Sequence, residues 1–392
     1  MRAELLFGGD GVTLVRTGVA MQSVRADQVG SLLRPPELLQ AWGQLFAGQL
    51  APERLREIED RAIEVALEAQ KRTGIDVYTD GEFRRIVYLT GLAQAVDGFA
   101  MGQGELLPWK ATGGEVPREM AEFHPPVVAD RLRLKGRVAG EESAFMRAHV
   151  PGQFKITLPS PAHFAESSYM PGLTDKAYPT RSDLLADITR ILADEAGQLA
   201  REGVPYVQVD APTYTWFADS SYDDWYRAHG IEKLAWLQDV IAADNQILDA
   251  AHAGGAVTAV HLCRGNGMGA WLASGGYDPI AEQVFSLRCD RLLLEYDTER
   301  AGTFEPLRLV PSDKVVVLGL VSTKIAELES ADDVLRRIEA AARYVAAERL
   351  ALSTQCGFAS DFRGNPLSED DQWRKLELVA SVSQRAWGGV AA

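Results

Sequence analysis

The sequence predicts an α/β protein built as a single (β/α)8 TIM barrel, and three observations support this fold class. Short apolar, β-branched runs alternate with longer segments of helical period, a pattern typical of a parallel sheet covered by helices. Eight such runs occur, and eight parallel strands close a barrel. The chain has 392 residues, 46% of them hydrophobic, which is enough to form one barrel of this kind.

The eight expected strands follow one another in chain order, and helical segments separate most of them. Each is short and rich in valine, leucine or isoleucine, as strands buried on both faces are. The expected strands are Arg25–Gly30, Asp76–Thr79, Phe154–Leu158, Tyr206–Val209, Val257–Leu262, Arg291–Glu295, Val315–Leu320 and Leu350–Ser353.

Three long helices are predicted from apolar stripes over Pro52–Thr73, Ser182–Glu202 and Ser330–Ala347. Glycine follows the first two, and glycine is a common residue after a helix end. In the third helix, Ser330 and Asp333 have the spacing of a capping box.

Residues 95–150 interrupt this alternation, because they are rich in glycine and proline and only weakly periodic. We expect an inserted segment near residues 95–150, forming a hairpin or a lid over the barrel mouth. Residues 1–20 look unlike the rest of the chain, and Met21 is a natural start. We therefore expect residues 1–20 to be a leader or disordered, and residues 21–392 to form the barrel domain.

Charge and cysteine content exclude several classes of function. A net charge of -15 argues against binding to nucleic acid or an anionic membrane. No apolar run reaches the length of about 18 residues that a helix needs to span a bilayer. Three cysteines in a long acidic chain do not form a disulfide framework, so we expect a cytoplasmic protein. Assembly into a homo-oligomer stays open.

Metal-type ligands stand at the ends of three expected strands. His261 and Cys263 lie in "VTAVHLCRGN", Glu295 lies in "RLLLEYD" and Cys356 lies in "LALSTQCGF". The carboxyl ends of barrel strands meet at one face, so these residues can surround one point. Alternate strand residues point the same way, which lets His261 and Cys263 bind one ion. Two thiolates, an imidazole and a carboxylate suit zinc better than magnesium or calcium.

Each of these residues also has a plainer interpretation. A single histidine or cysteine at a strand end is more often structural, so the spacing of His261 and Cys263 alone is a weak signal. It gains weight from Cys356, a second strand-end cysteine in a chain that has only three. The remaining one, Cys289, lies in a helix-to-strand connection at the opposite end of the barrel, and we interpret it as structural.

Seven motifs, in order, resemble the cobalamin-independent methionine synthase family. The resemblance is to its catalytic C-terminal barrel and to shorter single-barrel relatives, and it covers roughly residues 24–385. The most specific part is the H-x-C, E and C set on the expected strands. The motifs are "RADQVGSLLRP", "DVYTDGEFRR", "VQVDAP", "HLCRGN", "LLLEYD", "LGLVSTK" and "STQCGF".

This resemblance implies a zinc site made by His261, Cys263, Glu295 and Cys356. It also implies that homocysteine binds the metal through sulfur and attacks a methyl group, which yields methionine. The chemistry is consistent, because a free thiol has a pKa near 8.5 and is mostly protonated at neutral pH, whereas a metal removes the proton.

The resemblance further implies that Ser31, Glu82 and Asp210 bind the amino and carboxylate groups of homocysteine. Two carboxylates suit an ammonium group, and a hydroxyl suits a carboxylate. Without the family, Asp210 could equally be a helix cap or turn residue, and Ser31 and Glu82 would be ordinary polar residues. Arg84 and Arg85 are near enough to Glu82 in sequence that either could reach an anionic substrate group.

The sequence departs from the family pattern at two places. The usual aspartate–glutamate–proline triplet reads Asp210-Ala211-Pro212, which leaves substrate identity open. The segment "LVSTK" has Ser322, Thr323 and Lys324 where the family has a histidine that assists the departing folate. His163, in "PSPAHF", is the alternative catalytic acid, although a packed histidine is the simpler interpretation.

The methyl donor also stays open. The full-length enzymes hold polyglutamylated folate with a second, N-terminal barrel that this chain does not contain, so a simpler folate, a methyl-corrinoid or another electrophile could serve. Aromatic residues in "YTWFADSSYDDWY" could stack on a flat donor ring, with Trp216 as the candidate, or pack on one another. They are Tyr214, Trp216, Phe217, Tyr222, Trp225 and Tyr226.

Three other functions compete with methylation of homocysteine. The first is alkylation of a different thiol such as coenzyme M, in which an arginine would bind the sulfonate. The second is the metal-free barrel class that resembles uroporphyrinogen decarboxylase, which lacks the H-x-C and C set. The third is a binding protein with a structural zinc, although such sites usually hold paired cysteines and this chain has no such pair.

Overall fold

Six parallel strands form the central sheet of the computed structural model, which describes residues 23–388. The leader expected at residues 1–20 lies outside this described range. Each strand pairs with the next one in sequence order, and every strand residue except Val315 is buried. Each lies within two residues of its predicted boundaries. The strands are β3 (Ile156–Pro159), β4 (Tyr206–Asp210), β5 (Val257–Leu262), β6 (Arg291–Glu295), β7 (Val315–Val321) and β8 (Leu350–Thr354).

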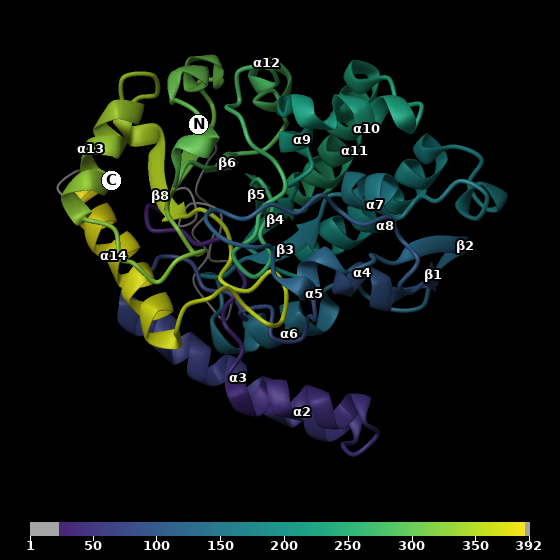
Figure 1. Ribbon diagram of the computed structural model, residues 1–392. Helices are drawn as coiled ribbons and strands as arrows, with labels where there is room; N and C mark the ends of the chain where they lie inside the picture. Colours follow the sequence, from purple (N-terminus) through teal and green to yellow (C-terminus); the bar gives the residue numbers. More distant parts are fainter. Residues whose placement is uncertain (1–22, 389–392) are drawn as a thin grey trace, which may run out of the picture.

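Two short segments continue this sheet from β8 round to β3. Ala26 bridges to Leu352 of β8, and Tyr78 bridges to Phe154 just before β3, both in the parallel sense. The two segments are joined to each other, because the Asp76 N–H donates to the Ala26 carbonyl at 2.9 Å. With helices around the outside (Figure 1), this arrangement is the predicted α/β TIM barrel.

Regular strands were predicted at residues 25–30 and 76–79, and this prediction is wrong, since each segment makes only a single bridge. Side-chain hydrogen bonds take the place of the backbone hydrogen bonds that a neighbouring strand would have made. The Asp76 carboxylate accepts the N–H groups of Arg25 and Ala26 at 2.8 Å each, and the Gln70 side chain accepts the N–H of Thr79 at 2.9 Å. A backbone group that a side chain satisfies needs no neighbouring strand.

Long helices cover the outside of the barrel (Figure 1). The helix predicted from Pro52 is confirmed, and Gly74 after it adopts a left-handed φ of 79°. The outer helices are α2 (Pro36–Phe46), α3 (Pro52–Thr73), α6 (Gly140–His149), α8 (Arg181–Arg201), α11 (Lys233–Ala253), α13 (Ala331–Ala341) and α14 (Glu369–Trp387).

The third predicted helix is shorter than its apolar stripe. It ends at Ala341, where the chain enters a turn. Val345, the last residue of the apolar stripe, is buried but lies after this turn and outside the helix. Ser330 is the N-cap residue but makes no side-chain capping bond, so the predicted capping box is wrong. Capping boxes occur instead at the starts of α8, at Thr180, and α14, at Ser368.

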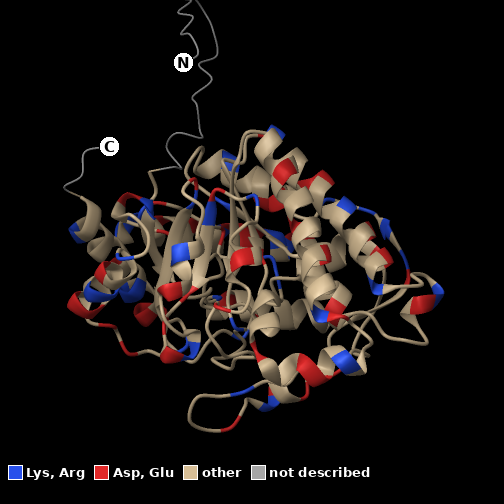
Figure 2. Ribbon diagram, turned by 90° about the horizontal axis from the view of Figure 1, so that it is seen from above, with Lys and Arg blue, Asp and Glu red and all other residues tan. Residues whose placement is uncertain are grey.

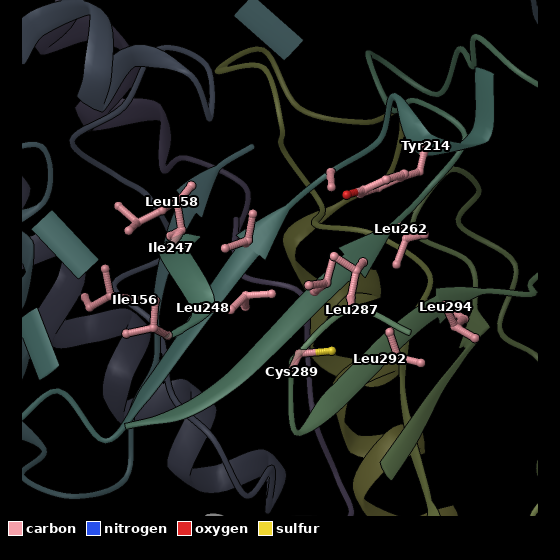
Figure 3. Close-up of a cluster of buried hydrophobic side chains, with 14 of the residues drawn as sticks. Ile156, Leu158, Tyr214, Ile247, Leu248, Leu262, Leu287, Cys289, Leu292 and Leu294 are labelled. Atoms are coloured by element: carbon pink, nitrogen blue, oxygen red, sulfur yellow. The ribbon is translucent and has the colours of Figure 1, made fainter. Parts of the chain in front are cut away.

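Apolar residues on the outer faces of the strands pack against these helices. Figure 3 shows Ile156 and Leu158 of β3 close to Ile247 and Leu248 of α11. Cys289 belongs to the same buried cluster just before β6, as its structural interpretation requires. Acidic and basic residues are interspersed over the helices (Figure 2). Within residues 23–388, each helix is too short or too polar to cross a lipid bilayer.

The segment predicted as an insertion, residues 95–150, begins with an antiparallel hairpin of β1 (Val96–Ala100) and β2 (Val127–Leu134) and ends with the outer helix α6. The loop between these strands contains α5 (Arg118–Ala121) and reaches the loop after β5. Lys110 and Trp271 exchange main-chain hydrogen bonds of 2.7 and 2.9 Å. The hairpin connection therefore lies over the carboxyl ends of the strands.

Short helices occupy the connections between the longer elements. They are α4 (Thr90–Ala95), α7 (Pro161–Ser167), α9 (Tyr214–Ala218), α10 (Asp223–Ala228) and α12 (Ala281–Val284), with 3₁₀ turns η1 (Thr174–Lys176), η2 (Ser220–Tyr222), η3 (Glu299–Ala301), η4 (Glu305–Leu309) and η5 (Ala347–Arg349).

Charged residues are buried inside the barrel. Lys155 donates to Asp27 at 2.8 Å, and both side chains are completely buried. The Tyr206 hydroxyl donates to the other Asp27 oxygen at 3.1 Å, and Arg291 lies 3.8 Å from it. Because burial removes the hydration of both ions, each depends on the other for compensation.

We predict that Asp27→Ala lowers the free energy of unfolding by about 3–5 kcal/mol, because it leaves the Lys155 ammonium buried without its counter-ion. Urea denaturation followed by circular dichroism measures this loss. The control is Asp97→Ala, which removes an exposed pair with Lys135 and is expected to change stability by no more than about 1 kcal/mol. Equal losses in the two variants would contradict the prediction.

Candidate active site

Three metal-type side chains meet at the carboxyl end of the barrel. His261 lies in β5, Cys263 follows that strand, and Cys356 lies two residues after β8. All three are buried, and their ligand atoms lie within 4.8 Å of one another. Both ring nitrogens of His261 are buried without a hydrogen-bond partner. A buried imidazole left free beside two sulfurs fits a zinc ion.

The two sulfurs differ in their tendency to ionise. The neighbouring Cys263 thiol stabilises the Cys356 thiolate, and His261 and Lys324 add positive charge, so the pKa of Cys356 lies well below its usual value despite burial. The same contact and burial raise the pKa of Cys263. At least one anionic sulfur is therefore favoured here even before an ion binds.

Strand alternation explains why these residues face inward. Val257 and Ala259 belong to the cluster inside the barrel, and His261 continues the same face of β5. Cys356 comes from the turn after β8, where the chain runs very close to Ser31. A Cβ atom on Gly357 would lie 2.0 Å from the Ser31 hydroxyl oxygen, so this turn requires glycine.

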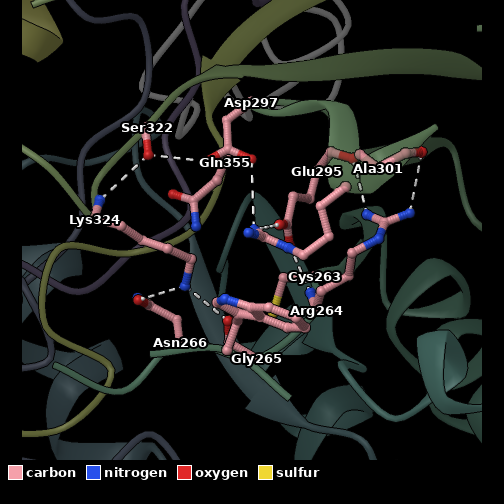
Figure 4. Close-up of polar contacts among 12 residues, drawn as sticks. Cys263, Arg264, Gly265, Asn266, Glu295, Asp297, Ala301, Ser322, Lys324 and Gln355 are labelled. Atoms are coloured by element: carbon pink, nitrogen blue, oxygen red, sulfur yellow. Dashed lines mark hydrogen bonds and ion pairs between the residues drawn. The ribbon is translucent and has the colours of Figure 1, made fainter. Parts of the chain in front are cut away.

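Glu295, the fourth predicted ligand, ends β6 beside Cys263 but is not one of the three converging residues. Its carboxylate accepts a hydrogen bond from the Arg264 N–H (Figure 4) and another, at 2.7 Å, from Arg300. Although burial opposes ionisation, Arg264, Arg300 and Lys324 lower the pKa of Glu295. The residue is thus an anion held beside the cluster, and its role as a ligand stays a prediction.

Two buried acids lie near the metal-type residues. Asp210 ends β4 and is paired in register with His261. Glu82 accepts a hydrogen bond from the Thr157 hydroxyl at 2.9 Å through one oxygen, and its other oxygen is buried without a partner. Burial raises the pKa of Asp210 to about 7, and the charge of Glu82 adds to the rise although His261 opposes it. Such a pair suits a cationic ligand group.

The backbone at Glu82 is strained. Its φ of 57° lies in the left-handed region, which residues other than glycine rarely adopt. The Asp80 carboxylate accepts the Glu82 N–H at 2.9 Å and helps to hold this turn. Strain of this kind often marks functional positions.

Ser31 lies at the same end of the barrel and is buried. Its carbonyl accepts the Phe358 N–H at 2.8 Å, and its hydroxyl accepts the Ala359 N–H at 3.3 Å. The structure therefore places Ser31 against the turn that follows Cys356, while Glu82 and Asp210 lie close to the other site residues.

His163 lies in α7, directly after β3, and contacts Tyr88. The Tyr88 hydroxyl is 3.1 Å from Nδ1 of His163. Burial lowers the pKa of His163 to about 4, so the imidazole is neutral at pH 7. This favours a hydrogen-bonding role, and the prediction that His163 is a catalytic acid remains untested.

Tyr88 is a site residue that sequence reasoning missed. Burial raises the pKa of its phenol well above the usual value, and the charges of Cys263, Asp210, Cys356 and Glu82 raise it further. The Tyr88 phenol therefore lies close enough to both cysteines and to both acids for their charges to affect its pKa. Its sequence context, "RRIVYLT", contains no signal that distinguishes it from a core tyrosine.

The two arginines after Glu82 are already paired with protein carboxylates. Arg85 forms an ion pair with Glu142 and donates to the Thr157 hydroxyl at 2.8 Å. Arg84 donates to Asp60 at 2.7 Å. These contacts correct the expectation that either guanidinium is available to an anionic substrate group.

Ser322, Thr323 and Lys324, which stand where a histidine was expected from the resemblance, all form hydrogen bonds with other groups of the protein. Ser322 donates to Asp297 at 2.8 Å, and Thr323 donates to Gln355 at 2.7 Å. The ammonium of Lys324 donates to acceptors of the loop after β5, at Gly265 and Asn266 (Figure 4) and at Ala270.

An aromatic cavity of about 310 Å³ lies beside this site, between the hairpin loop and helices α7, α9 and α10. Trp216 stacks on Tyr222 at 4.8 Å and meets Trp225 edge-on at 5.9 Å, and all three line the cavity. The Trp216 ring is 6.5 Å from that of His163. In contrast, Phe217 and Tyr226 stack on each other, so the aromatic loop both lines the cavity and packs on itself.

Several known proteins are similar to this chain in sequence over most of its length. The uncharacterized protein YxjG of Bacillus subtilis is 37% identical over 373 residues, covering 93% of this chain and 94% of that protein. A methionine synthase of Saccharolobus islandicus is 23% identical over 331 residues, covering 84% of this chain and 86% of that protein.

A solved structure has the same fold. It is a B12-independent methionine synthase from Shewanella sp. W3-18-1 in complex with selenomethionine, with a TM-score of 0.71 and 22% identity, covering 92% of this chain and 97% of that one. The family model of the cobalamin-independent synthase catalytic domain matches residues 26–365. The chain therefore belongs to the cobalamin-independent methionine synthase family, whose catalytic barrel it contains.

Proposed function

We propose that this protein is a zinc-dependent methyltransferase that binds homocysteine as a thiolate and methylates it to methionine. The observation that carries the proposal is one juxtaposition: His261, Cys263 and Cys356 converge beside two buried acids, one of which has an oxygen without a partner. A soft-metal donor set next to a cation-binding pair suits a molecule with a thiol at one end and an ammonium at the other.

His261, Cys263 and Cys356 would hold the zinc, with Glu295 as the fourth ligand or as a charge beside it. When bound, zinc supplies a lowered pKa to a substrate thiol, which then remains a nucleophilic thiolate at neutral pH. His261, Cys263 and Cys356 would hold three of the four positions that zinc usually takes, and the fourth would be open to a substrate sulfur where Glu295 does not occupy it.

The amino-acid end of homocysteine would bind to Glu82, Asp210 and Ser31. The free Glu82 oxygen and the Asp210 carboxylate accept from the ammonium, and binding a cation offsets the unfavourable burial of both acids. The Ser31 hydroxyl donates to the carboxylate. The selenomethionine complex of the Shewanella relative agrees with a methionine-like product.

Coenzyme M fits this arrangement less well than homocysteine. It carries a sulfonate where homocysteine carries an amino acid, so it needs positive charge at the far end of the site. The side chains available there, Glu82 and Asp210, are acids, and Arg84 and Arg85 are paired with protein acids. The charge distribution thus supports an amino-acid thiol.

The methyl donor would enter through the aromatic cavity next to His163. A volume of about 310 Å³ is at the small end for ligand pockets, which favours a single flat heterocycle of the folate type over a corrin macrocycle. Trp216 provides a stacking surface. Tyr88 and the neutral His163 form a hydrogen-bonded pair, and the His163 ring lies 6.5 Å from that of Trp216, so this pair would orient the departing nitrogen.

We predict that the wild-type protein holds about one zinc per chain and that His261→Ala and Cys356→Ser lose most of it, because each removes a ligand. Elemental analysis after gel filtration measures the ratio. Cys289→Ser, which removes a buried cysteine remote from the cluster, is the matched control and should keep its zinc. Unchanged zinc in both ligand variants would exclude this metal site.

Glu295→Gln tests the fourth ligand separately. Loss of its charge should weaken zinc binding by about tenfold to a hundredfold if Glu295 binds the ion or supports a ligand from beside it, as competition with a chelator measures. Unchanged affinity would place Glu295 outside the coordination sphere.

We predict that the zinc-loaded protein consumes homocysteine with a methyl-folate donor and forms methionine, as mass spectrometry detects. Coenzyme M should react at a far lower rate, because its sulfonate meets two acids. The same assay with methylcobalamin tests the corrinoid alternative. Failure of both thiols with both donors would refute the function even if zinc is present.

We predict that Trp216→Ala raises the KM for a methyl-folate about tenfold, the loss of one stacking contact of about 1.5 kcal/mol, while the KM for homocysteine stays the same. Phe217→Ala is the matched control, because Phe217 lies in the same helix but stacks on Tyr226. Steady-state kinetics with both variants measures the difference. Equal KM values in wild type and Trp216→Ala would remove Trp216 from the donor site.

A further inference from the structure

Asp210 is held by a neighbouring residue of its own strand. Gln208 and Asp210 are two apart in β4, so both side chains point into the barrel. The Gln208 amide nitrogen donates to the Asp210 carboxylate at 2.7 Å and to the Val29 carbonyl at 2.9 Å. With Gln208 completely buried, no water competes for these bonds.

The orientation of the Gln208 amide is itself determined by a buried charge. Lys155 donates to the Gln208 carbonyl oxygen at 2.8 Å. An ammonium has donors and no acceptor, so only the oxygen of Gln208 can face Lys155, and its NH₂ group must face Asp210. Lys155 is in turn fixed by Asp27 at 2.8 Å.

A chain of polar contacts therefore runs from the barrel interior to the candidate active site, through Asp27, Lys155, Gln208 and Asp210. The other three residues, Asp27, Lys155 and Gln208, are too deeply buried to touch a ligand. Their common effect is to hold one Asp210 oxygen toward Gln208, while the charge of Glu82 acts on the same carboxyl from nearby.

We propose that Gln208 is a positioning residue that makes the site selective for thiols bearing an amino group. The inference rests on the proposed function, since Asp210 must bind the ammonium of homocysteine. Gln208 acts only through Asp210, so it should influence recognition of the amino group and leave the thiol and metal contacts unchanged.

The test compares two thiols that differ in one group. Homocysteine and 4-mercaptobutanoate share the thiol and the carboxylate, but only the first has an amino group. Binding of each to the zinc-loaded protein is measured by calorimetry. Gln208→Leu should weaken homocysteine binding about tenfold to a hundredfold, the loss expected when a charge-assisted hydrogen bond is removed. Binding of 4-mercaptobutanoate should change by no more than about twofold, within the range of a remote substitution.

A second variant covers the case in which leucine prevents folding. Gln208→Glu keeps an oxygen for Lys155 but places its other oxygen against Asp210, so the selective loss of homocysteine binding should recur. The control is Asn245→Asp, which makes the same amide-to-acid change at a buried residue of α11 whose side chain accepts the Arg288 N–H. It should preserve the preference for homocysteine.

Three results would overturn the inference. If the Gln208 variants bind both thiols equally less well, the residue is merely structural; if they bind homocysteine like the wild type, Asp210 needs no positioning. In both cases the proposed function stands. A zinc-loaded wild type that binds neither thiol refutes the proposed function, and the positioning role with it.

Discussion

The in-and-out alternation of residues along the barrel strands is the constraint on which the site depends. Each strand places every second residue in the interior, and the last inward residue of a strand stands at the mouth. Asp210, His261 and Glu295 are such residues on three adjacent strands. A slip of one residue in any strand would exchange its site residue for an apolar one and would bury that residue's polar group among the helices.

Negative charge is concentrated at the mouth by the same alternation. Two carboxylates, Glu82 and Asp210, lie near a pair of sulfurs of which one ionises readily, and Glu295 adds a third carboxylate. Lys324 and Arg300 offset part of this charge from the rim. Arg85 lies 3.6 Å from the Glu82 carboxylate and burial raises the pKa of Asp210 to about 7, so part of this charge is compensated within the protein and a bound cation would offset the rest.

Much of this arrangement was predictable from the sequence, because strand ends and strand parity are local properties. The six regular strands and the meeting of His261, Cys263 and Cys356 follow from them. The irregular segments at residues 25–30 and 76–79 were mispredicted, since a side chain from one segment, Asp76, satisfies the backbone of the other. The pattern of apolar residues along the sequence gives no sign of a hydrogen bond between a side chain and a distant backbone group. Tyr88 and Gln208 were missed for a related reason: their importance lies in partners more than fifty residues away, at His163 and Lys155.

The hairpin contacts reach further than its own loop. Lys110 is joined through the main chain to Trp271, the Arg300 guanidinium lies 5.0 Å over the Trp271 ring, and Arg300 holds Glu295. A continuous series of contacts thus joins the loop of the inserted segment to the Glu295 carboxylate. A displacement of the inserted segment would also move Trp271 and the Arg300 guanidinium over its ring, and would thereby weaken the hydrogen bond from Arg300 to the Glu295 carboxylate.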